Sequence, residues 1–303
     1  MKTRLNLRVA AVALAIGAVL PLTANAHRAW MLPSSTVLSG NEPWVTVDAA
    51  VSNDLFYFDH NPIRLDGLVL FAPDGSKVTH ENASTGKYRS TFDVKLSQKG
   101  TYKFAMVNDS LNASYKIGTE TKRVRGTAES LAKEIPADAK DLSVSRSQSR
   151  MEIFVTSGKP SDTVLKPTNV GLELVAVTHP NDLFTGEAGN FQMILDGKPA
   201  ANIDVTVIPG GSRYRDKVGE MKVKTDADGK FSVKWPDAGM YWINASTGGG
   251  GMGGPGGAGG PGAGGPGSAP AAGAAPRPAG PVGTLAAPVR RASYSTTVEV
   301  LQN

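Results

Sequence analysis

The chain has 303 residues, no cysteine, and 32 Lys and Arg against 27 Asp and Glu. It therefore forms no disulfide and no thiolate metal site. No basic stripe with interleaved aromatic residues indicates nucleic-acid binding. After residue 26, no run approaches the length of an apolar membrane span, so we expect the mature chain to be soluble.

Residues 1–26 have the pattern of a secretory signal peptide. Three basic residues precede the apolar run VAAVALAIGAVLPL, and Ala24 and Ala26 occupy the −3 and −1 positions of a cleavage site. An uncleaved anchor is the alternative. Cleavage after Ala26 makes His27 the first residue of the mature protein, and export of a chain without cysteine favours a bacterial periplasm.

Most of the remaining chain alternates apolar and polar residues, which predicts half-buried antiparallel strands. The alternating stretches are 42–52, 65–80, 90–109, 151–157, 189–211, 219–246 and 292–301. Three dipeptides are expected to form hairpin turns: Asp74-Gly75, Asp196-Gly197 and Asp228-Gly229. Four tryptophans on predicted strands are expected in the core: Trp30, Trp44, Trp235 and Trp242. One helix is predicted within 126–140, with Thr127 as its N-cap.

A stretch rich in Pro, Thr and Gly at 158–171 predicts a boundary between two halves. We therefore expect an all-β protein with two antiparallel β-sandwich domains, at 27–160 and 168–303. In the second, TDADGKFSV followed by DAGMYWI resembles the transthyretin-like or carboxypeptidase-regulatory-like sandwich. This short motif supports a fold and not a function.

Residues 247–289 are nearly all Gly, Pro and Ala. Such a segment buries too little apolar surface to offset its ordering entropy, which predicts a disordered insertion. It separates two strands that we expect to be neighbours, so it is a loop insertion in a hairpin. A tolerated flexible loop and a tether that contacts a partner are both open interpretations.

His27 is the main candidate for chemistry. As a first residue it offers an α-amine and an imidazole, which together chelate one metal ion when both are unprotonated. The reference pKa values of these groups, about 8 and 6.5, allow this near neutral pH. Such nitrogen ligands suit Ni(II), Co(II), Cu(II) or Zn(II). The plain alternative is that cleavage happens to leave a histidine first.

The other histidines are His60, His80 and His179. Each by itself is more typical of a structural or surface histidine. His60 or His179 could complete a three-nitrogen site with His27, and Asp59 could serve as a ligand or as an acceptor behind a ligand. His80 is expected at the surface. The sequence contains no lipase elbow, zincin or phosphate-loop motif, and the DADG at 226–229 is more typical of a turn than of a calcium loop.

Several stretches together resemble the DUF4198 family of exported bacterial proteins. They are AHRAWMLPSS, FYFDHNPI, GLELVAVTHPNDLFTGE, LDGKPAANIDVTVIPG and TDADGKFSVKWPDAGMYWINA. That family is similar to the periplasmic component associated with nickel and cobalt uptake. The resemblance implies a periplasmic β-sandwich whose leading His27 binds a transition metal. Metal-handling members are often rich in histidine, whereas this chain has four.

We therefore expect a non-enzymatic periplasmic protein that binds nickel, cobalt or copper and presents it to a membrane uptake system or an outer-membrane receptor. A non-metal adaptor that binds a receptor or a cell-envelope component through its sheet edges is the alternative. An oxidative copper enzyme built on an amino-terminal histidine is a third reading. It requires a second histidine on the same metal.

Overall fold

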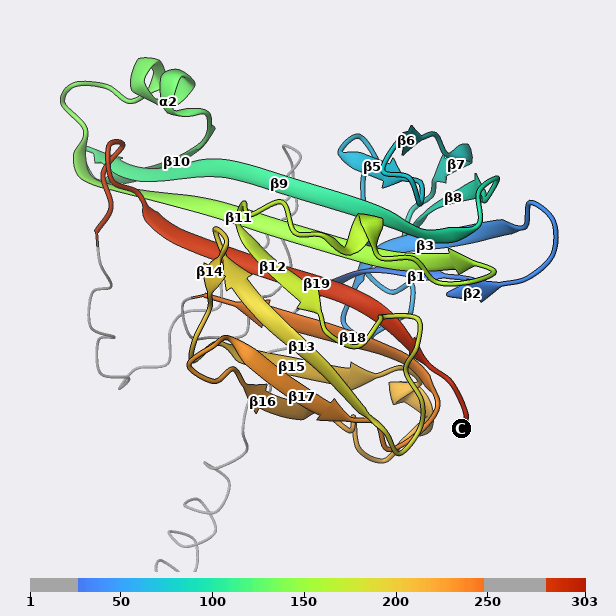
Figure 1. The fold of residues 1–303 in the computed structure, drawn as a ribbon. Coiled ribbons are helices and arrows are strands. Elements are labelled where there is room, and N and C mark those ends of the chain that lie inside the picture. Colours follow the sequence, from blue (N-terminus) through green and yellow to red (C-terminus); the bar gives the residue numbers. More distant parts are fainter. Residues whose placement is uncertain (1–26, 248–281) are drawn as a thin grey trace, which may run out of the picture.

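A computed structural model describes residues 27–247 and 282–303. The predicted signal peptide and the bulk of the predicted insertion lie outside these residues. The described chain consists of three β-sheets and little helix, which confirms the all-β prediction (Figure 1). The helical elements are α2 (Ala128–Glu134), η1 (Thr163–Leu165) and η2 (Ser212–Tyr214).

The largest sheet has ten strands and runs through both halves of the chain. Its order is β16 (Met221–Lys224), β15 (Asp204–Pro209), β18 (Gly239–Ser246), β19 (Val289–Val300), β11 (Lys140–Ser157), β9 (Gly100–Ile117), β5 (Leu68–Phe71) and β6 (Lys77–Val78), with β10 (Glu120–Gly126) beside β9 and β2 (Val37–Leu38) beside β11. The neighbours β18 and β19 are antiparallel, as expected for the strands that flank the insertion.

Two smaller sheets complete the fold. The five-stranded sheet has the order β1 (Arg28–Pro33), β3 (Trp44–Ser52), β8 (Ser90–Lys95) and β7 (Glu81–Thr85), with β4 (Asn61–Pro62) beside β3. The four-stranded sheet has the order β12 (Leu172–Ala176), β13 (Ala188–Leu195) and β14 (Lys198–Pro199), with β17 (Lys230–Lys234) beside β13.

The small sheets cover opposite faces of the large one. Ile153 of β11 lies in the core formed with β3 and β8. Its neighbour Glu152 points to the other face, because side chains alternate along a strand. On β19, Tyr294 is paired with Arg150 and therefore shares that other face, where it lies in the core formed with β12, β13 and β17. Each half of the chain thus buries its own core against one common sheet.

The pairing differs from the prediction in one respect. β11 pairs in parallel with β19, from Ser145↔Val289 to Ile153↔Thr297, and also in parallel with β2. The large sheet is therefore mixed and not purely antiparallel. The predicted boundary at 158–171 falls between β11 and β12, and the two predicted domains share a sheet across it. Whether they fold separately stays a prediction.

Two turns behave as predicted and a third does not. Asp74-Gly75 joins the paired strands β5 and β6, and Asp196-Gly197 joins β13 and β14. Asp228-Gly229 was expected to close a hairpin, but it connects β16 of the large sheet to β17 of the four-stranded sheet. The Asp-Gly dipeptide specifies a tight turn. Which strand each flanking segment pairs with depends on the packing of its side chains in the core.

Burial confirms three of the four tryptophans as core residues. Trp30, Trp235 and Trp242 are buried, whereas Trp44 is 45% exposed at the start of β3, so its prediction is wrong. The last part of the predicted insertion, residues 282–289, belongs to the described chain. There Gly283 accepts a hydrogen bond from the backbone N–H of Val144, which attaches this segment to the long β9–β10–β11 arm at upper left in Figure 1.

Candidate metal site

His27 and His60 stack on one another. Their ring centroids are 3.8 Å apart, with an angle of 22° between the rings. Strand register explains the meeting, since β1 and β4 lie on opposite sides of β3. Arg28 pairs with Ser52, and Asn61 pairs with Val51, so each histidine directly precedes a strand that begins beside the end of β3. The structure thus brings together two of the four predicted site residues.

Both rings are half-buried, and within the described residues neither ring nitrogen takes part in a hydrogen bond. Two imidazoles at this separation need only side-chain rotation to direct one nitrogen each at a common ion, with bonds of about 2 Å. The donor set is nitrogen only, which suits nickel, cobalt, copper or zinc better than calcium or magnesium. In the stacked arrangement the nitrogen lone pairs lie in two nearly parallel planes and do not converge on one point.

Asp59 holds the loop that carries His60. Its two carboxylate oxygens accept hydrogen bonds from the backbone N–H groups of Asn53 and Asp54, at 2.9 and 3.2 Å. These bonds close the 53–59 segment at the end of β3, where Phe56 has a positive φ of 64°. Asp59 therefore positions the loop, and its oxygens are already occupied as acceptors. The sequence suggests Asp59 as a ligand or as an acceptor behind a ligand. In the structure it accepts hydrogen bonds from the backbone of its own loop.

The start of β1 is fixed to the same loop. The indole of Trp30 donates to the hydroxyl of Ser52 at 2.8 Å, and that hydroxyl donates to the backbone carbonyl of Asp54 at 2.6 Å. Arg28 donates to the carbonyl of Asn53 at 3.0 Å. Both histidines are consequently attached to one rigid corner at the end of β3.

The second half of the chain clamps this corner. The Arg213 guanidinium contacts the carboxylate of Asp54 at 3.1 Å and lies 4.4 Å from the centre of the Tyr57 ring. A Cβ at Gly210 would lie 3.0 Å from the Phe56 ring and 3.2 Å from the carbonyl oxygen of Met240, so a larger residue would require these neighbours to shift. No local pattern predicts this clamp, because Arg213 and Asp54 are 159 residues apart along the chain.

His179 lies at a different place in the fold. Its Nε2 is 3.1 Å from the hydroxyl of Thr101, and its Nδ1 accepts a hydrogen bond from the backbone N–H of Asn181 at 3.1 Å. Burial lowers the pKa of this imidazole, and nearby acceptors and carboxylates only partly oppose the shift. Both ring nitrogens are engaged, which is typical of a structural histidine. In residues 27–247 and 282–303, no three His, Asp or Glu side chains gather as a metal-binding group.

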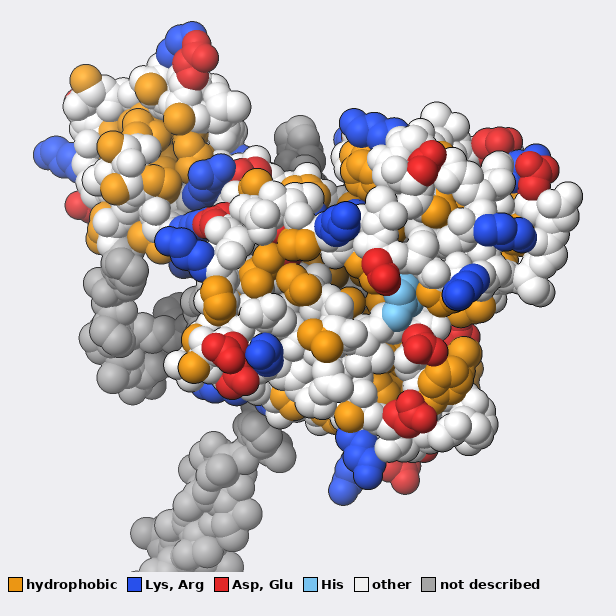
Figure 2. All heavy atoms as spheres, viewed as in Figure 1, with side chains coloured by type: hydrophobic (Ala, Val, Ile, Leu, Met, Phe, Trp, Pro, Cys, Tyr) orange, Lys and Arg blue, Asp and Glu red, His pale blue; other side chains and the backbone are white. Residues whose placement is uncertain are grey.

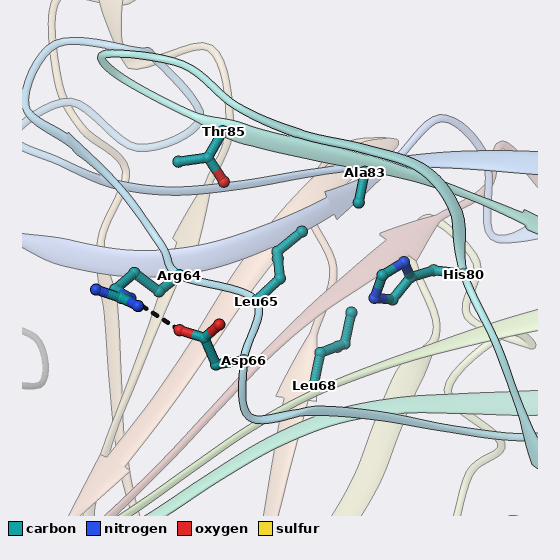
Figure 3. Close-up of a pocket in the computed structure, with 7 residues that line it drawn as sticks. All are labelled: Arg64, Leu65, Asp66, Leu68, His80, Ala83 and Thr85. Atoms are coloured by element: carbon teal, nitrogen blue, oxygen red, sulfur yellow. Dashed lines mark hydrogen bonds and ion pairs between the residues drawn. The ribbon is translucent and has the colours of Figure 1, made fainter.

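His80 lines a separate surface cavity of about 590 Å³ (Figure 3). The other lining residues are Arg64, Leu65, Asp66, Leu68, Ala83 and Thr85. Arg64 and Asp66 form an exposed ion pair at 2.8 Å, so their charges offset one another at the cavity. His80 is the only imidazole in this lining, and the only carboxylate there, Asp66, is paired with Arg64.

The fold and the histidine pair define a class: an all-β protein with a mixed central sheet and two imidazoles held at one end of a small sheet. A family model described as "Domain of unknown function (DUF4198)" matches residues 24–249. The chain belongs to this family. Across the described residues, no helix is long and apolar enough to cross a membrane.

Other comparisons add no function. No curated protein matches the chain. Among solved structures, the D0-D1 domain of Intimin is 13% identical, with 71% of this chain and 88% of that chain covered and a TM-score of 0.20. A DUF4785 family protein from Legionella pneumophila is 8% identical, with 71% and 52% covered and a TM-score of 0.21. At these TM-scores the likenesses carry no argument.

Proposed function

We propose that this protein is a non-enzymatic, periplasmic transition-metal-binding protein that serves metal uptake through a site at the amino terminus of its mature chain. The stacking of His27 on His60 is the observation that carries the proposal. Cleavage after Ala26 supplies a free amine on His27. The amine and two imidazoles then offer three nitrogen donors from only two residues.

The described geometry holds the two histidines close together before a metal binds, so that only their side chains have to rotate. The Asp59 hydrogen bonds and the Arg213 clamp hold the His60 loop, and the Trp30–Ser52 hydrogen bond holds β1. A preorganised pair loses less conformational entropy on binding than two free side chains. Nickel, cobalt and copper are the cargo that three nitrogen donors favour.

A three-nitrogen set leaves coordination positions open for a second protein. Such an open site suits transfer to a membrane uptake system or an outer-membrane receptor, because the ion can be handed on by ligand exchange. The same open position is what an oxidative copper enzyme requires. Turnover of a reductant-driven oxidation by the copper-loaded protein would favour the enzyme over the carrier.

The test is calorimetric titration of Ni(II), Co(II) and Cu(II) into protein that begins at His27. We expect one equivalent to bind, and His60→Ala to weaken binding about tenfold or more, as for a lost ligand. A form that begins at Leu22 retains both imidazoles but moves the amine away, and it should weaken similarly. His80→Ala is the matched control and should bind like the unchanged protein.

Equal affinity of the His27 and Leu22 forms would contradict a site that uses the amine. If His60→Ala binds the metal as tightly as the unchanged protein does, a site shared by the two histidines is contradicted.

The adaptor alternative draws on β7, an edge strand whose five residues Glu81–Thr85 are all exposed. Recovery of the same binding partner with and without a chelator would favour that alternative.

A further inference from the structure

A cavity of about 370 Å³ lies against the large sheet, on the face that also carries Tyr294. Its floor comes from β5, β9 and β11, and residues 163–168 of the connection to β12 line its other side. The registers Phe71↔Lys103 and Arg150↔Val107 place these four side chains on one face. The stretch predicted as an interdomain boundary is thus one wall of a cavity.

Lys103 lies in this cavity and is only 8% exposed. Within residues 27–247 and 282–303, its ammonium group makes no hydrogen bond and no ion pair, and it lies 5.5 Å from the centre of the Phe71 ring. The alkyl stem of Lys103 is buried, whereas its ammonium nitrogen stays accessible at the cavity. The Phe71 ring lies within the range of a cation–π contact with this ammonium group.

Arg150 is a second cation at the cavity, and its charge is balanced by carboxylates. Its guanidinium contacts Glu152 at 3.0 Å and Glu173 at 3.6 Å, and it donates to the hydroxyl of Thr168 at 2.9 Å. Its Nε has no partner among the described residues. The cavity lining contains no Asp or Glu, and it contains Lys166 as a third cation. Among the cations of the cavity, Lys103 therefore combines a buried stem with a charge that has no paired carboxylate within the described residues.

The rest of the lining is largely apolar. Val69, Phe71, Ala105 and Val107 rise from the strands, and Val164 is buried opposite them. Val107 is 49% exposed, so the apolar surface continues to solvent. A volume in the range of small-molecule sites, apolar walls and one convergent charge favour a small ligand over a macromolecule.

We infer that this cavity binds a small organic anion: a carboxylate or similar head group at Lys103, with a short apolar tail along Val107. The anion supplies the missing counterion, and the tail buries the exposed apolar wall. The cavity lining includes neither His27 nor His60, and the inference does not depend on metal binding. The competing explanation is that water alone solvates Lys103.

Octanoate is the probe for this site, measured by titration calorimetry on the protein that begins at His27. We expect one equivalent to bind, and 1-octanol, which shares the chain but lacks the charge, to bind at least tenfold more weakly. One charge-assisted hydrogen bond is worth more than the ~1.4 kcal/mol that corresponds to this factor. Octanol bound as tightly as octanoate, or octanoate not bound at all, would overturn the inference.

Two variants locate the binding. Lys103→Met keeps the apolar stem and should lower octanoate affinity about tenfold or more while leaving octanol unchanged. Val107→Glu changes an exposed position, which protects the fold, and should repel octanoate more than octanol. Lys77→Gln removes an exposed cation outside the cavity and is the control. If Lys103→Met and Val107→Glu both bind octanoate like the control, the anion binds elsewhere and the assignment is wrong.

Discussion

The position of the His60 side chain depends on residues that hold its loop. The carboxylate of Asp59 satisfies two backbone N–H groups that would otherwise lack partners in the tight 53–59 loop. Such acceptors stabilise a loop, and they also determine where its terminal side chain lies. The same carboxylate therefore links loop stability to the position of an imidazole.

We expect Asp59→Ala to weaken nickel binding by about tenfold, since it frees the loop while retaining both imidazoles. Calorimetric titration of the variant measures this effect directly. Asp66→Ala, at an exposed ion pair on the neighbouring loop, is the matched control. Unchanged affinity in Asp59→Ala would show that the His60 loop holds its position without this carboxylate.

His179 makes a separate prediction about pH. Because burial lowers its pKa in the folded state, the unfolded chain binds more protons than the folded chain below about pH 6.5. The stability that depends on the neutral ring is fully present above this pH and is lost as the pH falls from the unfolded pKa toward the folded one. The N–H of Asn181 donates to the neutral ring, which fits this direction.

Urea unfolding at pH 7.5 and pH 5 tests the assignment. His179→Gln should narrow the stability difference between the two pH values, because glutamine does not titrate. His80→Gln, on the other sandwich, should leave that difference as it is. An identical pH dependence in all three proteins would mean that His179 does not contribute to it.

At the scale of elements, Gly229 shows how a turn joins two sheets. It has a φ of +75°, and a Cβ there would lie 2.4 Å from the carbonyl oxygen of Met193 and 2.9 Å from the backbone nitrogen of Ala200. Its own carbonyl accepts a hydrogen bond from Met193 at 2.8 Å. The turn is therefore seated against β13, and both its conformation and its contacts require glycine.

Gly229→Ala should destabilise the protein by clearly more than the ~1–2 kcal/mol of a left-handed alanine alone. Gly171→Ala is the matched control, since its φ is +78° and nothing lies within 4 Å of its added Cβ. Thermal or urea unfolding compares the two. Equal losses would mean that β13 and the turn move apart easily to admit a methyl group.

Local sequence patterns identified the strands that have one buried face and one more exposed face. Alternation predicted β3, β8, β13 and β17, in which buried and more exposed side chains largely alternate. It missed β1, which is buried along most of its length, and β10, which is mostly exposed and polar. Neither strand has one apolar and one polar face, so apolar and polar residues do not alternate along it.

Only part of the site could be predicted, because local patterns do not show which strands pair. His27 and His60 could be named from the sequence, but their stacking depends on β1 and β4 pairing with one strand, which no local pattern encodes. His179 was grouped with them, whereas its position is fixed by Thr101 and Asn181. Lys103 occupies a polar place in an alternating strand, and the residues 163–168 that line the same cavity come from a distant part of the chain.

At the scale of the whole molecule, the long strands β9, β11 and β19 form a common support for both halves (Figure 1). Apolar side chains also gather on the projecting arm around α2 (Figure 2), where Leu131 is buried against Ala113 and Val144. Trp30 and Leu55 from the first half pack with Ile208 and Trp242 from the second. The corner that carries the histidines is thus stabilised from both halves.

We expect a fragment of residues 27–160 not to fold cooperatively by itself. It would lose β19 and leave the edge of β11 unpaired along residues 145–153, a surface prone to association. The Trp30 cluster would also lose Ile208 and Trp242. Circular dichroism melting and sedimentation compare the fragment with the full chain. A soluble monomer with a sharp melting transition would instead support two independent domains.

The central claim is that His27 and His60 share one metal ion. Because the chain has only four histidines, labelling them with ¹⁵N and adding Ni(II) to protein that begins at His27 tests this most directly. Single substitutions assign each imidazole signal. We predict that the His27 and His60 signals change together and that this change is complete at one equivalent of Ni(II). The signals of His80 and His179 should persist. A response that begins at His80 or His179, or no response at one equivalent, would contradict the claim.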